Sequence, residues 1–225
     1  MKKRLTLLIL VFSFTASEAC ESPYQEIFHS VVETQLQNFP YVDVENPSLI
    51  IAFSGTPGMG KTTITKRLEE EFHGIRISSD DLRNELRTHG LDPDKRPPYM
   101  PISHLQSCST LLFQALSLKS PNHLFILDKS IDRTFPFFKQ LQTPLFTIRL
   151  ELGREEIENR IRESKKNPEA YLIHLDKWLA DYNALENEEF SFTVDASQPV
   201  DKIISQLVLA IQNELAKNTL KPCES

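Results

Sequence analysis

The stretch Gly55-Thr56-Pro57-Gly58-Met59-Gly60-Lys61-Thr62 decides the fold, because it matches the pattern GxxxxGK[ST] at every position. The apolar run 49–53 precedes it, and a helical pattern over 62–72 follows. A glycine loop between a strand and a helix lets backbone N–H groups curl around phosphate oxygens, and the helix N-terminus adds partial positive charge there. The context therefore predicts a phosphate-binding loop rather than an ordinary glycine turn.

The residues of this loop have expected roles in binding ATP and Mg²⁺. Lys61 is expected to reach the β- and γ-phosphates, and the Thr62 hydroxyl is expected to ligate Mg²⁺. The candidate phosphate-binding residues are Gly55, Thr56, Pro57, Gly58, Met59, Gly60, Lys61, Thr62 and Thr63.

Apolar runs alternate with helical patterns along the chain and predict the fold class. The expected strands are 49–54, 75–78, 124–127, 145–150 and 190–194. The expected helices are 62–72, 80–88, 103–118, 135–141, 154–166, 169–185 and 200–216. This alternation is typical of a three-layer α/β/α sandwich with a five-stranded parallel sheet, the P-loop NTPase class. Ligands of such sheets bind beyond the carboxyl ends of the strands.

Three charged residues stand at such strand ends. Asp128 follows the strand 124–127, where a carboxylate helps to hold Mg²⁺, although an Asp that caps a turn is the alternative. Asp80 and Arg83 follow the second strand. Asp80 is expected to accept the proton of an acceptor hydroxyl while Arg83 clamps the substrate. The alternative is that Ser79 or Asp80 serves only as a helix N-cap.

The charged stretch 154–166 follows the fourth strand and has two interpretations. It is either a solvent-exposed helix that carries i,i+4 ion pairs or a mobile lid. A lid brings arginine onto the transferring phosphate, where its charge stabilises the transition state and closure excludes water. Arg160 is the first candidate for this catalytic role, and Arg162 is the second. Trp178 and Tyr182 are expected in the core rather than on a base-stacking platform.

In this order, GTPGMGKT, ISSDDLR (77–83), FILDKS (125–130) and the Arg-rich stretch resemble the P-loop small-molecule kinase group. The group includes zeta-toxin-like kinases, the kinase domain of 5′-polynucleotide kinases and kinases labelled AAA family ATPases. The resemblance covers about residues 48–215. In polynucleotide kinases the first Asp of the second motif is the base and its Arg contacts the acceptor phosphate, which the resemblance implies for Asp80 and Arg83.

The resemblance implies a kinase that moves the γ-phosphate of ATP to a hydroxyl of a small molecule or nucleotide sugar. A 5′-polynucleotide kinase is one alternative. A nucleotide-binding switch or exported effector with weak NTPase activity is another, and an oligomeric NTPase motor is a third. The formal net charge of −6 implies no basic channel, which disfavours a nucleic-acid partner. The protein is expected to be a monomer that binds ATP and an unidentified hydroxyl-bearing substrate.

The N-terminus carries the features of a secretory signal. Lys2-Lys3-Arg4 precedes a short apolar run over 5–14, and small residues stand at Ser17 and Ala19. This pattern predicts a signal peptide over 1–19 and therefore export, with a cytoplasmic protein that keeps the segment as the alternative. The apolar run is too short to span a membrane as a helix, so the mature form is expected to have no spanning segment.

The rest of the chain divides into an extension, one kinase domain and a tail. Apolar residues at helical spacing over 23–39 indicate a helix within the extension, 20–47. The kinase domain is expected over 48–217, with its lid at about 153–168, and 218–225 form the tail. None of the three cysteines has metal-binding spacing; Cys20 and Cys223 could pair in an oxidising compartment, and Cys108 is expected to be a buried thiol.

Overall fold

The computed structural model describes residues 25–37, 49–95, 103–105, 108–109, 112, 124–132 and 144–219. Its strands are β1 (Leu49–Ser54), β2 (Ile75–Ser78), β3 (Leu124–Ser130), β4 (Leu145–Glu151) and β5 (Phe192–Asp195). Its helices are α1 (Gln25–Gln37), α2 (Lys61–Phe72), α3 (Ser79–Thr88), α6 (Arg154–Ser164), α7 (Glu169–Leu172), α8 (Leu175–Asn183) and α9 (Val200–Thr219). The predicted signal peptide, residues 220–225 of the predicted tail, the expected helix 135–141, most of the expected helix 103–118, Cys20 and Cys223 lie outside the described residues. Residues 218 and 219, assigned to the tail from the sequence, belong to α9.

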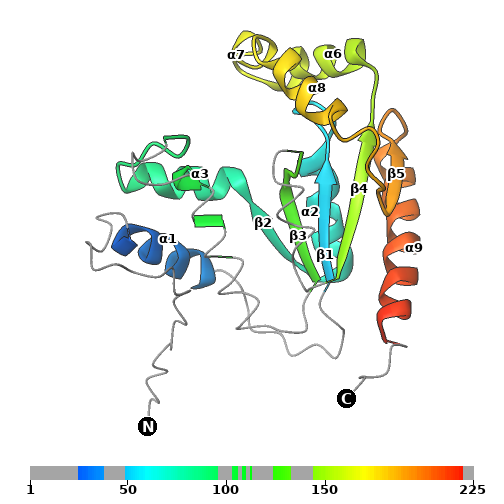
Figure 1. Cartoon of the computed structure of the whole chain (residues 1–225), viewed down its shortest axis with the longest axis horizontal. Coiled ribbons are helices and arrows are strands. Elements are labelled where there is room, and N and C mark those ends of the chain that lie inside the picture. Colours follow the sequence, from blue (N-terminus) through cyan, green and yellow to red (C-terminus); the bar gives the residue numbers. More distant parts are fainter. Residues whose placement is uncertain are drawn as a thin grey trace.

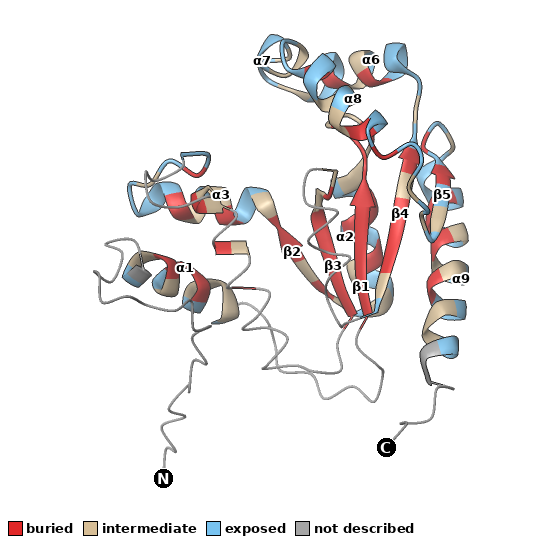
Figure 2. Ribbon diagram, viewed as in Figure 1, coloured by how far each residue is buried: buried red, intermediate tan, exposed pale blue. Residues whose placement is uncertain are grey.

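The five strands form one sheet in the order β2-β3-β1-β4-β5, and every neighbouring pair is parallel (Figure 1). The sheet confirms the predicted α/β class with a five-stranded parallel sheet. All six residues of β1 are buried, as expected of a central strand covered on both faces (Figure 2). The carboxyl ends of the strands point toward α6, α7 and α8, which lie together beyond the arrowheads in Figure 1.

Alternation along β1 divides the core into two apolar clusters, one on each face of the sheet. Leu49, Ile51 and Phe53 belong to a cluster with buried residues of α2, α6 and α9. Ile50 and Ala52 belong to a cluster with buried residues of α1 and α3. Because successive side chains of a strand point to opposite faces, this split produces the three layers that the sequence predicts.

Helix α1 is part of the second cluster. Its side chains Phe28, Val31 and Val32 are buried, and they share that cluster with Leu82 and Leu86 of α3. The predicted helix of the N-terminal extension therefore covers one face of the sheet together with α3. Cys108 is also buried in this cluster, as predicted, and burial raises the pKa of its thiol to about 12. No described helix combines the length and the apolar character needed to cross a membrane.

Several predicted bounds are corrected by up to three residues: β5 is 192–195 rather than 190–194, α6 ends at 164 rather than 166, and α9 continues to 219 rather than 216. Two further corrections bear on the site. The single helix expected over 169–185 is two helices, α7 and α8. The chain tightens between them, because the N–H of His174 donates to the carbonyl of Tyr171 only three residues earlier (3.0 Å). Strand β3 continues to Ser130, so Asp128 lies inside the strand and faces Ser78 of β2 in register.

Two leucines of α9 provide a test of the first core cluster. Leu207 is fully buried in that cluster, whereas Leu209 of the same helix is 61% exposed. Leu207→Ala is expected to lower the free energy of unfolding by about 2–5 kcal/mol, because it leaves a cavity. Leu209→Ala is the matched control, with the same change in helix propensity and an expected effect within about 0.5 kcal/mol. Urea denaturation of both variants measures the difference, and equal losses would contradict the assigned core.

Candidate functional site

The phosphate-binding loop connects β1 to α2. Gly58 and Gly60 have φ angles of 89° and 87°, which side-chain-bearing residues rarely adopt. A Cβ on Gly58 would lie 3.0 Å from the carbonyl oxygen of Ile157 and 3.1 Å from Cγ1 of Ile161, both on α6. The tip of the loop is therefore packed directly against α6, and only glycine fits there.

Lys61 folds back over the loop that it follows. Its Nζ donates to the carbonyl oxygens of Gly55 (2.7 Å) and Thr56 (2.8 Å). Burial lowers the pKa of this ammonium to about 8, and the negative charges of Asp132 and Asp128 act in the opposite direction. A lysine ammonium beside a glycine loop at a helix N-terminus can form a site for an anion with several oxygens, such as a polyphosphate.

A cleft of about 1570 Å³ opens over this loop. All nine predicted phosphate-binding residues line it, and so do the other predicted site residues except Arg162. The structure thus brings together residues from four separate parts of the chain. The residues in question are Gly55, Thr56, Pro57, Gly58, Met59, Gly60, Lys61, Thr62, Thr63, Asp80, Arg83, Asp128 and Arg160.

The two predicted metal ligands are neighbours. The Thr62 hydroxyl donates to Oδ1 of Asp128 at 3.1 Å, and Oδ2 of the same carboxylate accepts from Nη1 of Arg76 at 2.6 Å. No group of three or more His, Cys, Asp or Glu residues suited to a metal occurs among the described residues. A hydroxyl and one carboxylate beside a phosphate site still fit Mg²⁺, which takes one or two protein oxygens and completes its shell with substrate phosphates and water.

Asp80 and Arg83 form a pair at the start of α3. Nη1 of Arg83 lies 3.4 Å from Oδ1 of Asp80, and Nη2 lies 3.3 Å from Oδ1 of Asp94. The side chain of Asp80 is 82% exposed. The alternative that Ser79 or Asp80 is the N-cap is wrong, because Ser78 caps α3: its hydroxyl accepts a hydrogen bond from the N–H of Asp81. The Asp80 carboxylate is thus not needed as a cap and lines the cleft.

The two candidate lid arginines of α6 differ in position. Both donate to a carboxylate one turn earlier: Arg160 to Glu156 at 2.9 Å and Arg162 to Glu158 at 3.3 Å. Only Arg160 lines the cleft, together with Lys165 just after the helix. The i,i+4 ion pairs predicted for a solvated helix are therefore present, and one face of the same helix reaches the cleft.

Sequence reasoning missed several residues that line the cleft or support it. Lys129 and Asp132 follow Asp128 and line the cleft. Burial and the like charge of Arg83 lower the pKa of Lys129 to about 8, and Oδ1 of Asp132 is buried without a hydrogen-bond partner among the described residues. Arg76, which holds Asp128, was missed as well. Its signal in the sequence is a charged residue between the isoleucines of a short strand.

The two aromatic residues expected in the core have different environments. Tyr182 is buried and its hydroxyl donates to the carbonyl of Leu150 at 3.0 Å, as a core tyrosine should. Trp178 is only partly buried, packs near the rings of Tyr171 and His174, and lines the cleft. The core prediction therefore holds for Tyr182 and is only partly correct for Trp178.

Comparisons with known proteins agree with this fold. The profile of the family described as AAA domain matches residues 50–185. Among solved structures, shikimate kinase from Aquifex aeolicus vf5 superposes with a TM-score of 0.51 and 13% identity, over 73% of this chain and 97% of that one. A gluconokinase from Sinorhizobium meliloti 1021 superposes with a TM-score of 0.51 and 14% identity, over 77% of this chain and 96% of that one.

A sugar kinase from Janibacter sp. HTCC2649 gives a TM-score of 0.50 and 17% identity, over 79% of this chain and 99% of that one. At such identities the likeness establishes the fold and not the substrate. A search of curated proteins by sequence found no match.

Gly58 and Gly60 form a matched pair for testing the contact between the loop and α6. Alanine at either position adopts a strained positive φ, but only at position 58 does the new Cβ meet α6, since nothing lies within 4 Å at position 60. Gly58→Ala is expected to lower the free energy of unfolding by about 1–3 kcal/mol more than Gly60→Ala, the usual range for overpacking. Urea denaturation without nucleotide measures this, and equal losses would contradict the contact.

Proposed function

The chain belongs to the AAA domain family, and we propose that it is an ATP-dependent kinase that phosphorylates a hydroxyl of a small molecule or nucleotide sugar. One observation carries the proposal: the phosphate-binding loop, the Thr62–Asp128 pair and the Asp80–Arg83 pair line the same cleft. The cleft therefore places a phosphate site beside the Asp80 carboxylate and has room for a second substrate next to it. The fold shared with shikimate kinase and a gluconokinase supports a small-molecule acceptor.

The loop and α2 account for ATP binding in this proposal. Backbone N–H groups of the loop and the N-terminus of α2 hold the phosphates, and Lys61 exchanges the carbonyls of Gly55 and Thr56 for phosphate oxygens. Thr62 and Asp128 would hold Mg²⁺, which when bound neutralises charge on the phosphates. The loop tip contacts α6, so the phosphates are bound next to the helix that carries Arg160.

Asp80 is the proposed base on the acceptor side. As the acceptor oxygen bonds to the γ-phosphorus, the bond between that phosphorus and the β–γ bridging oxygen breaks and ADP leaves. The hydroxyl proton passes to the Asp80 carboxylate, which the Arg83 guanidinium orients. Arg83, Arg87 and Lys129 line this part of the cleft and would attract an acceptor with negative charge.

Helix α6 supplies the proposed lid. Arg160 already lines the cleft, and release of its ion pair with Glu156 would let it reach the transferring phosphate. Lys165 lines the cleft beside it and is a second source of positive charge. Arg162 stays a candidate only if α6 turns on closure, because its side chain pairs with Glu158 away from the cleft lining.

An acceptor panel tests the proposed activity and its base. The protein is incubated with Mg²⁺ and γ-labelled ATP and with nucleotide sugars, nucleosides, amino sugars or 5′-hydroxyl oligonucleotides, and mass spectrometry detects the gain of one phosphate. Asp80→Asn is expected to lower kcat by about 10²–10⁴-fold, the usual contribution of a general base, with ATP affinity retained.

Glu85→Gln is the matched control, because it removes a carboxylate from the same helix outside the cleft lining. Full activity of Asp80→Asn would remove Asp80 from the mechanism. Tight ATP binding with no labelled acceptor in any mixture would instead favour the nucleotide-binding switch.

Lys61→Ala tests the phosphate site. The substitution is expected to abolish transfer with the fold intact, because the hydrogen bonds of Lys61 within the described residues go to two carbonyls of its own loop. Steady-state kinetics and thermal unfolding of Lys61→Ala measure the two effects. Lys66→Ala, an exposed lysine of the same helix, is the control that should behave as wild type. A fully active Lys61→Ala protein would contradict the phosphotransferase.

A further inference from the structure

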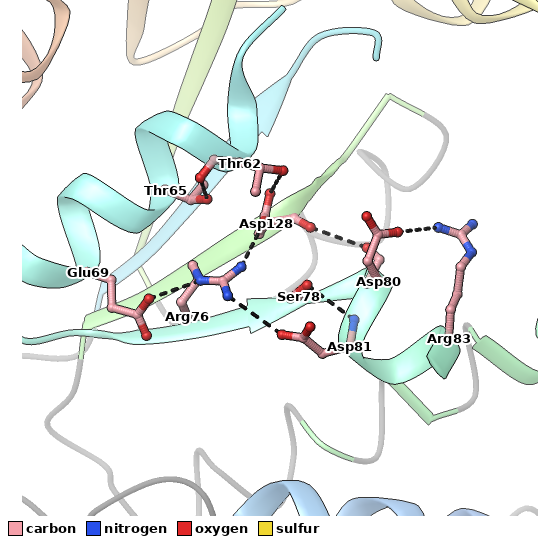
Figure 3. A network of polar contacts seen from close by, with 10 residues as sticks. Thr62, Thr65, Glu69, Arg76, Ser78, Asp80, Asp81, Arg83 and Asp128 are labelled. Carbon is pink, nitrogen blue, oxygen red and sulfur yellow. Dashed lines mark hydrogen bonds and ion pairs between the residues drawn. The ribbon is translucent and has the colours of Figure 1, made fainter. Parts of the chain in front are cut away.

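Arg76 gathers three carboxylates from three different elements. It lies on β2 between Ile75 and Ile77, which belong to the cluster on the α1 and α3 side, so its own side chain points to the opposite face. There its guanidinium meets Oδ2 of Asp128 on β3 at 2.6 Å, Oε2 of Glu69 on α2 at 3.0 Å and Oδ2 of Asp81 on α3 at 3.6 Å (Figure 3).

The carboxylate of Asp128 needs this partner. Its side chain is only 5% exposed, whereas those of Glu69 and Asp81 are 40% and 58% exposed. A buried charge without a partner is costly, so the contact with Asp128 dominates the three. The planar guanidinium fixes Oδ2, and this leaves Oδ1 directed at the Thr62 hydroxyl.

Arg76 also links the metal ligands to the acceptor side. Asp81 follows Asp80 in the first turn of α3, and Ser78 at the end of β2 caps the same turn. One side chain on β2 therefore contacts the carboxylate that would hold Mg²⁺ and the helix that carries the proposed base.

On the basis of the proposed function, we propose that Arg76 is a positioning residue that sets the Asp128 carboxylate for binding of the Mg²⁺–nucleotide complex. It acts through Asp128 and touches no substrate itself. Without the guanidinium, Oδ2 of Asp128 loses its hydrogen-bond donor. The carboxylate is then free to rotate, and Oδ1 is no longer held toward Thr62. A lysine keeps the charge but lacks the planar fork, so it restores the function only in part.

The test measures how far Mg²⁺ tightens binding of a non-hydrolysable ATP analogue, as the ratio of Kd in EDTA to Kd in Mg²⁺. Calorimetry is run on wild type, Arg76→Met, Arg76→Lys, Asp128→Asn and the double variant Arg76→Met with Asp128→Asn. Arg76→Met is expected to keep the Kd in EDTA within about twofold and to lower the ratio about tenfold, a typical coupling between contacting groups.

Arg76→Lys is expected to lower the ratio by less. The double variant should show no further loss than Asp128→Asn alone, because Arg76 acts through that carboxylate. Arg67→Met on α2 is the matched control: it removes an ion-paired arginine that lies outside the cleft lining and should keep the wild-type ratio.

A purely structural role for Arg76 would lower the thermal unfolding midpoint and leave the ratio unchanged, and that result overturns the proposal. The proposal is also overturned if the fold-decreases in the Kd ratio caused by Arg76→Met and Asp128→Asn multiply in the double variant. A Kd ratio near one for the wild-type protein would overturn it as well. If Arg76→Met does not fold, the comparison of Arg76→Lys with wild type decides, and an unchanged ratio contradicts the proposal. No phosphotransfer is measured, so failure of the acceptor panel and failure of this proposal are separate results.

Discussion

The structure depends on one buried negative charge at the carboxyl end of an apolar sheet. Asp128 lies in β3 after four buried apolar residues, and its carboxylate can stay there only with partners on both oxygens. Thr62 supplies one partner from the first turn of α2, and Arg76 supplies the other from β2. The phosphate-binding loop, two neighbouring strands and the start of α3 are thus placed around one carboxylate. The cleft lies where parallel strands would place a ligand in any case, and this charge fixes which side chains meet there.

Much of the fold and of the site follows from local sequence. The loop 55–62 requires a strand before it and a helix after it, and the continuous apolar run 49–53 requires a sheet that is covered on both faces. Asp80, Arg83 and Asp128 were found because parallel strands carry their carboxyl-end residues to one edge. Each motif is recognised from residues within a few positions of each other, and the rule that parallel strands end at one edge is the only non-local step.

The features that sequence did not predict arise from contacts between distant residues or from small differences between local states. Arg76 and Asp128 are 52 positions apart, and nothing local to either residue identifies the other. Ser78 caps α3 in place of Ser79 or Asp80, a choice among adjacent polar residues that spacing does not distinguish. The break at Ile173–His174 and the position of Trp178 depend on how α7 and α8 pack over the cleft. Such outcomes are decided by tertiary packing, which overrides local preference.

The packing of α1 determines how far this protein can be truncated from its N-terminus. The recognisable motifs begin at β1, and a domain boundary drawn from them falls at about residue 48. However, Phe28, Val31 and Val32 of α1 complete the cluster that contains Leu82 and Leu86, on the helix that carries Asp80 and Arg83. Removal of the first 47 residues would expose that apolar face of α3 to water. The shortest stable unit is therefore expected to include α1 and to begin no later than Gln25.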